Sequence, residues 1–224
     1  MSKINKIPLD MVNGSVHNTK YGDVVITGYN GAFDVDVMFT ETGFKVKAQS
    51  GSIRRGNVRD PMSRTCQGIG FIGVGKHKPS VNGIHTPEYT RWYNMLIRCY
   101  NKEYQEKFPT YKGCTVCDHW HNFQNFAEWF YDNYPRDGDI YHLDKDIRTD
   151  GNKEYSPLSC LFVTPDDNNE KAQAKTYLFK SPEGLKVEVY NVSKFSRENN
   201  LNDGHMCAVS LGKRQSHKGW RKWK

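Results

Sequence analysis

The chain has 224 residues, of which 37% are hydrophobic and 13% aromatic, so it can bury one or two small cores and does not have the composition of a disordered polymer. The net charge of +7 argues against a mimic of DNA, because such a mimic needs an acidic surface. Met1 is not followed by the apolar segment of a signal peptide, and no run of about 18 apolar residues exists. We therefore expect a cytoplasmic protein without a membrane partner.

The charge is unevenly distributed. Residues 1–100 carry 13 basic and 7 acidic residues, residues 101–170 carry 7 and 14, and residues 171–224 carry 12 and 4. An acidic middle between basic flanks favours a cation-binding centre between segments that contact phosphate groups. The alternative is that the basic flanks only keep the protein soluble.

The first residues, 1–20, are polar and predict a loose arm. Three strands are then expected at Val24–Tyr29, 34–40 and 43–48, joined by tight turns into a small antiparallel sheet. Such a sheet can lie in the major groove of DNA, or it can be a packing sheet with basic outer residues. The basic segment after it supplies three candidate DNA contacts: Arg54, Arg55 and Arg59.

A glycine-rich run at 68–75 lacks the Gly-Lys-Ser/Thr ending of a phosphate loop, so we expect a strand that other backbone approaches closely. Thr86 followed by Pro87 predicts the start of an amphipathic helix over 88–100. A second, aromatic helix is expected after Trp120. The aromatic side chains of both helices are expected to form a supporting core.

The six cysteines of a cytoplasmic protein are expected to be thiols. Cys114 and Cys117 have the spacing of zinc ligands, and His119 and His121 follow them. A structural zinc site normally needs two such pairs, so we expect buried thiols here rather than zinc.

The most informative segment is 140–169, which reads as a strand, a polar turn, a second strand and the start of a helix. Period two places His142, Asp144 and Asp146 on one face of the first strand. The turn contains Asn152, and a helix that begins at Thr164-Pro165 would carry Asn168 and Asn169. A compact ββα unit of this kind can hold one hard divalent cation, Mg²⁺ or Mn²⁺, through oxygen ligands.

Each of these residues also has an ordinary structural explanation. The two aspartates beside Lys145 can form a solvated strand edge, and an isolated His142 can be structural. Asn152 can be present because hairpin turns favour asparagine. Asn168 and Asn169 can be exposed helix residues.

The segment resembles the core of HNH (His-Me-finger) endonucleases of the phage and homing type, and the wider pattern over 90–170 resembles phage proteins described in that way. The resemblance implies that Asp144 binds the metal together with Asn168 or Asn169, and that Asn152 orders the hairpin. Lys145 stands where the family has its general-base histidine, and an ammonium group cannot accept a proton. His142, or next Asp146, would then activate water, while Lys145 would stabilise phosphate charge.

The C-terminal segment predicts strands at 177–179 and 186–190, then helices at 194–200 and 205–211. This order, followed by a basic tail, is typical of a helix-turn-helix, and 177–220 resembles the intron-encoded nuclease repeat. The resemblance implies DNA binding. The candidate DNA contacts are Ser210, Lys213, Arg214, Gln215, Lys218 and Arg221.

We therefore expect an α+β protein with three domains: a basic β-sheet at 1–80, an HNH-like ββα core at 81–174 and a helix-turn-helix module at 175–224. The function expected is metal-dependent cleavage or nicking of double-stranded DNA in the cytoplasm of an infected host cell, without a small-molecule substrate. The alternatives are a non-catalytic DNA-binding regulator on the same scaffold and a small module that blocks a host enzyme.

Overall fold

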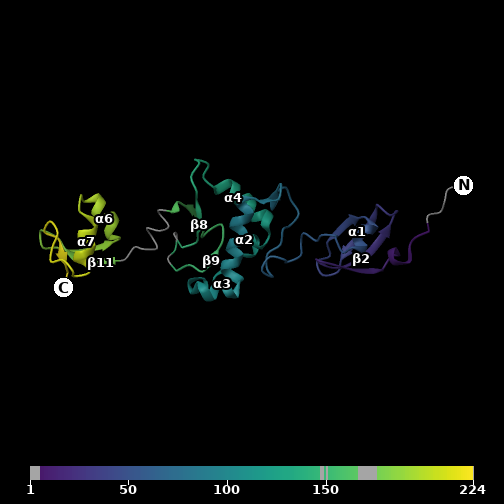
Figure 1. Ribbon diagram of the computed structural model, residues 1–224, viewed down its shortest axis with the longest axis horizontal. Coiled ribbons are helices and arrows are strands. Elements are labelled where there is room, and N and C mark those ends of the chain that lie inside the picture. The colour runs from purple at the N-terminus through teal and green to yellow at the C-terminus, as the bar shows by residue number, and fades with distance from the viewer. Residues whose placement is uncertain (1–5, 147–148, 150, 166–175, 224) are drawn as a thin grey trace. The chain divides into compact units, whose positions relative to one another are not determined.

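The computed structural model describes residues 6–146, 149, 151–165 and 176–223 (Figure 1). The predicted α+β class is confirmed, because the described residues form several small sheets together with helices. The chain divides into two compact units. The first contains residues 1–134 and 145–161, and the second contains residues 135–144 and 162–224.

The first unit begins with a four-stranded antiparallel sheet. Its strands, in spatial order, are β1 (Val16–Thr19), β2 (Gly22–Tyr29), β3 (Val35–Phe39) and β4 (Lys45–Ala48). The three predicted strands are confirmed. For residues 9–19 the predicted loose arm is wrong, because β1 pairs with β2 and a 3-10 helix, η1 (Leu9–Met11), places Met11 in the core.

One face of this sheet is buried. Ile26, Val37 and Phe39 alternate with more exposed neighbours along β2 and β3, as period two requires, and they pack with Ile53 of α1 (Ser50–Arg54). The helix therefore covers the inner face, and the other face carries Val16, Val25 and Met38 together with polar side chains.

The helical part of the first unit is centred on α2 (Pro87–Tyr100) and α4 (Phe123–Asn133). Both predicted helices are confirmed, and each begins with a side-chain cap: Thr86 accepts from the amide of Tyr89, and Asn122 accepts from that of Gln124. Aromatic rings fill the space between them, as expected. The other elements of this part are β5 (Ser80–Val81), β6 (Ile84–His85), α3 (Lys102–Lys107), η2 (Pro109–Tyr111) and η3 (Asp118–His121).

The glycine-rich run does not form the regular strand that the sequence predicted. It makes only isolated bridges, in which Gly70 pairs with Cys66 and Phe71 pairs with Asn122. The predicted close approach is confirmed, since a Cβ on Gly70 would lie 2.8 Å from the Trp92 ring and closer still to Leu96.

Two short sheets follow the helices. In the first unit, β7 (Thr115–Val116) pairs in parallel with β9 (Glu154–Tyr155). β8 (His142–Asp144) pairs with β10 (Leu161–Val163), where the sequence predicted two strands. Pro165, predicted as the first helical residue, is helical.

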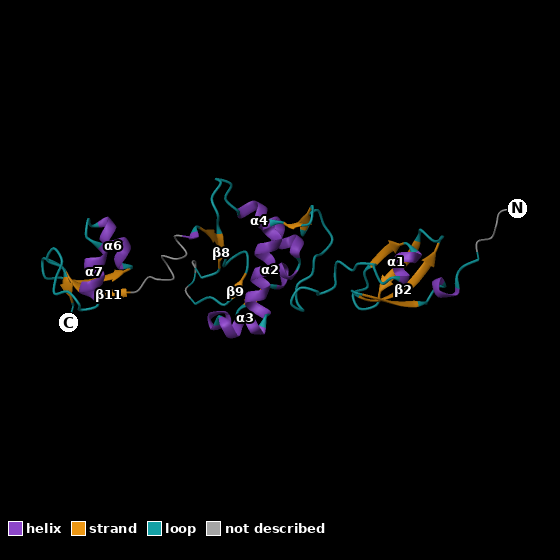
Figure 2. Ribbon diagram, in the orientation of Figure 1, coloured by secondary structure: helices purple, strands orange, loops and turns teal. Residues whose placement is uncertain are grey.

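The C-terminal part of the second unit is a three-stranded sheet with two helices (Figure 2). The strand order is β12 (Lys186–Tyr190), β11 (Thr176–Lys180), β13 (Arg221–Lys222), and both pairings are antiparallel. The helices are α6 (Val192–Glu198) and α7 (Asp203–Ser210). The predicted strands and helices are confirmed, and β13 was not predicted.

We expect Gly70→Ala to lower the free energy of unfolding of the first unit by about 1–3 kcal/mol, because the new methyl group would overlap the rings and methyl groups of α2. Urea unfolding followed by tryptophan fluorescence measures this. Gly51→Ala is the matched control: its Cβ would meet only the flexible end of Arg55, and alanine suits a helix. Equal stability of the two variants would contradict the close packing at Gly70.

Candidate functional site

Strand β8 presents its side chains alternately. Leu143 is buried, whereas His142 is exposed and Asp144 is half-buried. Because side chains two residues apart lie on the same face of a strand, His142 and Asp144 share the outer face of β8. The sequence prediction for these two residues therefore agrees with their exposure.

The end of the β8–β10 sheet, where β8 begins and β10 ends, borders a cavity of about 510 Å³. Its lining residues are Gly138, Asp139, Ile140, Thr164 and Pro165. Asp139 is the one ionisable side chain among these described lining residues. The cavity lies beside the strand that carries His142 and Asp144.

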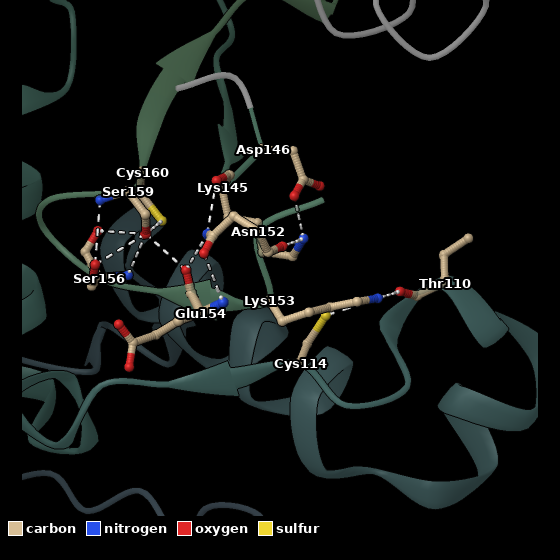
Figure 3. Close-up of polar contacts among 10 residues, drawn as sticks. All are labelled: Thr110, Cys114, Lys145, Asp146, Asn152, Lys153, Glu154, Ser156, Ser159 and Cys160. Carbon is tan, nitrogen blue, oxygen red and sulfur yellow. Dashed lines mark hydrogen bonds and ion pairs between the residues drawn. The ribbon is translucent and has the colours of Figure 1, made fainter. Parts of the chain in front are cut away.

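Lys145, the residue after β8, turns inward and is only 6% exposed. Its ammonium Nζ lies 2.6 Å from Oδ1 of Asp146 and donates to the carbonyl oxygen of Asn152 at 2.5 Å (Figure 3). The same nitrogen lies 5.8 Å from the centre of the Tyr155 ring. Burial of a charge is costly unless the charge is paired and hydrogen-bonded, and these three contacts meet that requirement.

The side chain of Asn152 bonds to backbone groups on both sides of the loop between β8 and β9. Its amide Nδ2 donates to the carbonyl oxygens of Lys145 at 3.0 Å and Glu154 at 2.6 Å, and its Oδ1 accepts from the amide of Glu154 at 3.3 Å. The backbone amide of Asn152 donates to the carbonyl oxygen of Thr149. Lys145 and Asn152 are therefore bonded to each other twice, once through each side chain.

The loop is fixed to the helical part of the first unit through β9. The backbone amides of Thr115 and Cys117 donate to the carbonyl oxygens of Lys153 and Tyr155, and Nζ of Lys153 donates to the Thr110 carbonyl oxygen at 2.9 Å. Tyr155 is 2% exposed, and burial raises the pKa of its hydroxyl. Sequence analysis missed Tyr155, although an aromatic residue directly before Ser-Pro was a signal of a buried strand end.

A serine turn connects β9 to β10. Oγ of Ser159 donates to the Glu154 carbonyl oxygen at 2.7 Å and accepts from the amide of Ser156, and the amide of Cys160 donates to the Ser156 carbonyl oxygen (Figure 3). Cys160 is fully buried at the end of this turn. These bonds were not predicted, because serines in a loop give no sequence signal of their partners.

The predicted catalytic and metal-binding residues thus occupy different environments. His142 and Asp144 lie on the outer face of β8, whereas Lys145 and Asn152 have side chains occupied by bonds within the loop. The carboxylate of Asp146 is half-buried and is in contact with the Lys145 ammonium. Asn168 and Asn169 lie outside the described residues.

Within the described ranges, no group of three or more His, Cys, Asp or Glu side chains could hold a metal ion. Mg²⁺ and Mn²⁺ can be bound by one or two carboxylates, with water and phosphate oxygens completing the coordination. The donor set here fits that mode, since Asp144 is a half-exposed carboxylate on a fixed strand. Asp146 fits it less well, because Lys145 already neutralises its charge.

Zinc was not expected at the cysteine pair. Cys114 is buried and Cys117 is half-buried, and both are free thiols. Burial raises the pKa of Cys117, and it raises the pKa of nearby Cys99 to about 12. The prediction of buried thiols is therefore confirmed for Cys114, whereas Cys117 is only half-buried.

The predicted DNA contacts of the N-terminal sheet are partly engaged within the protein. Arg54 makes two hydrogen bonds to the carboxylate of Asp10, at 2.7 and 3.0 Å, and this pair lowers the pKa of Asp10. Arg55 and Arg59 are exposed. On β4, Lys47 bridges Asp34 and Asp36, so the sheet itself carries less free positive charge than its sequence suggests.

The predicted DNA contacts of the C-terminal segment also differ in exposure. Ser210 is 4% exposed and its hydroxyl donates to the carbonyl oxygen of Cys207, so it lies inside the fold. Two exposed cations bond to backbone: Arg214 to the Ser216 carbonyl oxygen and Lys218 to that of Asn200. The remaining predicted contacts, Lys213, Gln215 and Arg221, are exposed.

We expect Lys145→Met to lower the free energy of unfolding of the first unit by about 1–3 kcal/mol, because the Asn152 carbonyl oxygen and the Asp146 carboxylate lose their donor. Lys153→Met is the matched control, since its exposed side chain makes one bond to backbone and its loss should cost about 0.5 kcal/mol. Urea unfolding of the two variants measures the difference. A Lys145 variant as stable as the control would show that the buried ammonium does not hold the loop.

Comparison of the chain with models of protein families, with curated proteins and with solved structures found no match. In the part of the chain that the structure describes, no helix is both long and apolar enough to cross a membrane. Function therefore has to be argued from the geometry and charge of the residues themselves.

Proposed function

We propose that the protein is a DNA endonuclease of the HNH type, which hydrolyses a phosphodiester bond with the help of one divalent metal ion. The observation that carries the proposal is the outer face of β8, where a histidine and a carboxylate lie two residues apart on one strand. An imidazole can accept a proton from water, and a carboxylate is the ligand that Mg²⁺ or Mn²⁺ prefers.

In this mechanism His142 is the general base and Asp144 is the metal ligand. A bound Mg²⁺ or Mn²⁺ supplies stabilisation of the negative charge that develops on the phosphate. His142 takes the proton from the attacking water, and the water oxygen forms a bond to phosphorus. The bond from phosphorus to one ester oxygen breaks with its electron pair on that oxygen, which takes up a proton from solvent water. Asn168 and Asn169, outside the described residues, are the candidate further ligands.

Lys145 and Asn152 have a positioning role in the proposal. Their side chains bond to each other's backbone and close the loop that follows β8. The family resemblance assigns the hairpin asparagine an ordering role, and the bonds of Asn152 support that role. The ammonium of Lys145 is occupied by Asp146 and Asn152, which argues against a direct contact between Lys145 and phosphate.

The helix-turn-helix layout of α6 and α7 and the basic C-terminal segment support DNA as the partner of the proposed enzyme. Residues 171–224 carry 12 basic and 4 acidic residues, and phosphate contacts by such a segment make binding strongly dependent on salt. The proposed DNA contacts are the exposed cations Lys213, Arg214, Lys218 and Arg221.

The second candidate function is a DNA-binding regulator that has kept this scaffold without hydrolysis. One observation favours it: the residue at the place of the family's catalytic histidine is Lys145, which is buried and bonded within the loop. The two candidate functions differ in whether the residues on the outer face of β8 catalyse hydrolysis of DNA, so a cleavage assay distinguishes them.

We expect the protein to nick supercoiled plasmid DNA in the presence of Mg²⁺ or Mn²⁺. Nicking should stop when EDTA is added, because EDTA removes the metal ion. Asp144→Ala should lower the cleavage rate by at least about 100-fold, because the phosphate loses its charge stabilisation, while DNA retention stays unchanged. Glu103→Ala, which removes an exposed carboxylate from α3, is the control and should cleave normally.

Normal cleavage by Asp144→Ala would show that the metal ligand is assigned wrongly. If the unaltered protein binds DNA in a salt-dependent way but does not cleave it in Mg²⁺ or Mn²⁺, the result would instead support the function of a DNA-binding regulator.

A further inference from the structure

The C-terminal sheet has one buried face and one exposed face. Phe179 of β11 and Val189 of β12 point to the core, where they pack with Val192, Met206 and Val209 from the helical side. The residues that alternate with them are exposed, so α6 and α7 cover one face only. In Figure 2 the two helices lie together beside the strands of this sheet.

A row of three cations crosses the exposed face. Lys186 of β12 lies directly opposite Lys180 of β11, and Lys180 lies directly opposite Arg221 of β13. All three side chains are exposed. Like charges in directly opposed positions destabilise a sheet, so this arrangement favours an anion bound across the three strands.

Aromatic and apolar side chains lie beside the cation row on the same face. Trp223 follows Arg221 by two residues, and its amide donates to the carbonyl oxygen of Leu178 at 2.9 Å. Leu178 and Tyr190 are 38% and 60% exposed. Glu188, the acidic residue of this face in β12, lies opposite Leu178. Its carboxylate repels phosphate, so we expect the phosphate groups of a ligand to bind at the cation row and an uncharged part of the ligand to contact the apolar side chains.

A cavity of about 310 Å³ lies at the β13 edge of the sheet and is lined by Lys180, Arg221, Lys222 and Trp223. Lys180 and Arg221 belong to the exposed face, whereas Lys222 pairs with Phe179 and alternates with Arg221. A flat ring beside positive charge is the combination that binds a nucleotide, with the base on the ring and the phosphate on the cations. A base can reach such a ring only when it is not paired within a duplex.

We propose that this exposed face of the C-terminal sheet is a binding site for single-stranded DNA. The phosphates bind along the row formed by Lys186, Lys180 and Arg221, and one base stacks on Trp223. The site shares Arg221 with the DNA contacts proposed above, whereas Lys180, Lys186 and Trp223 are not among those contacts. The inference shares with the proposed function only the assumption that DNA is the ligand. Binding at this face needs neither Asp144 nor a metal ion, so it can be tested independently of cleavage.

The test measures binding by the full chain in EDTA, so that it does not depend on cleavage. Fluorescence anisotropy with an oligo(dT) probe of about 12 nucleotides should show saturable binding, with a slope of log K against log salt near −2 for three phosphate contacts. Lys180→Ala/Lys186→Ala should weaken binding by at least about 10-fold and make the slope shallower. The charge-matched control, Lys112→Ala/Lys194→Ala, removes two exposed lysines elsewhere and should bind normally.

Stacking is tested separately at Trp223. Trp223→Ala should weaken binding about 5- to 100-fold with an unchanged salt slope, and Trp223→Phe should restore most of the affinity. The lysine variant should be at least as stable to urea as the unaltered protein, because it removes opposed like charges. The proposal is overturned if oligo(dT) does not bind, if the control weakens binding equally, or if a duplex of the same length binds and the single strand does not.

Discussion

The burial of the Lys145 ammonium is the interaction on which the centre of the first unit depends. A buried charge has to keep its partners, and these are Asp146, the carbonyl oxygen of Asn152 and the ring of Tyr155. To supply them, the chain has to turn back after β8, and Asn152 bonds the two ends of the turn together. The return strand β9 is then held in parallel beside β7, across about 40 residues of sequence.

The burial of Lys145 also separates the residues that hold the loop from those proposed to act on a substrate. Lys145 stands where a nuclease of the resembling family has its histidine, but its side chain points inward and serves the loop. In the proposed function, proton transfer is therefore assigned to His142, which shares the outer face of β8 with Asp144.

Local sequence signals predicted most elements, because caps and periodicity act over a few residues. Thr86-Pro87 located α2, and alternation located β8. The short polar strand β1 was missed because Val16–Thr19 has almost no apolar pattern and forms only by pairing with β2. The sequence analysis expected Lys145 to stabilise phosphate charge and missed its burial, because its partners Asp146 and Asn152 are set by the return of the chain through a loop.

The most direct test of the buried ammonium is hydrogen exchange at single amides in the unaltered protein and in Lys145→Met. If Lys145 holds the loop closed, the amides of Asn152 and Glu154, which bond within the loop, should exchange at least about 10-fold faster in the variant. The amides of α2 should keep their protection. Unchanged protection of Asn152 and Glu154 would show that the loop closes without the ammonium and would contradict the account.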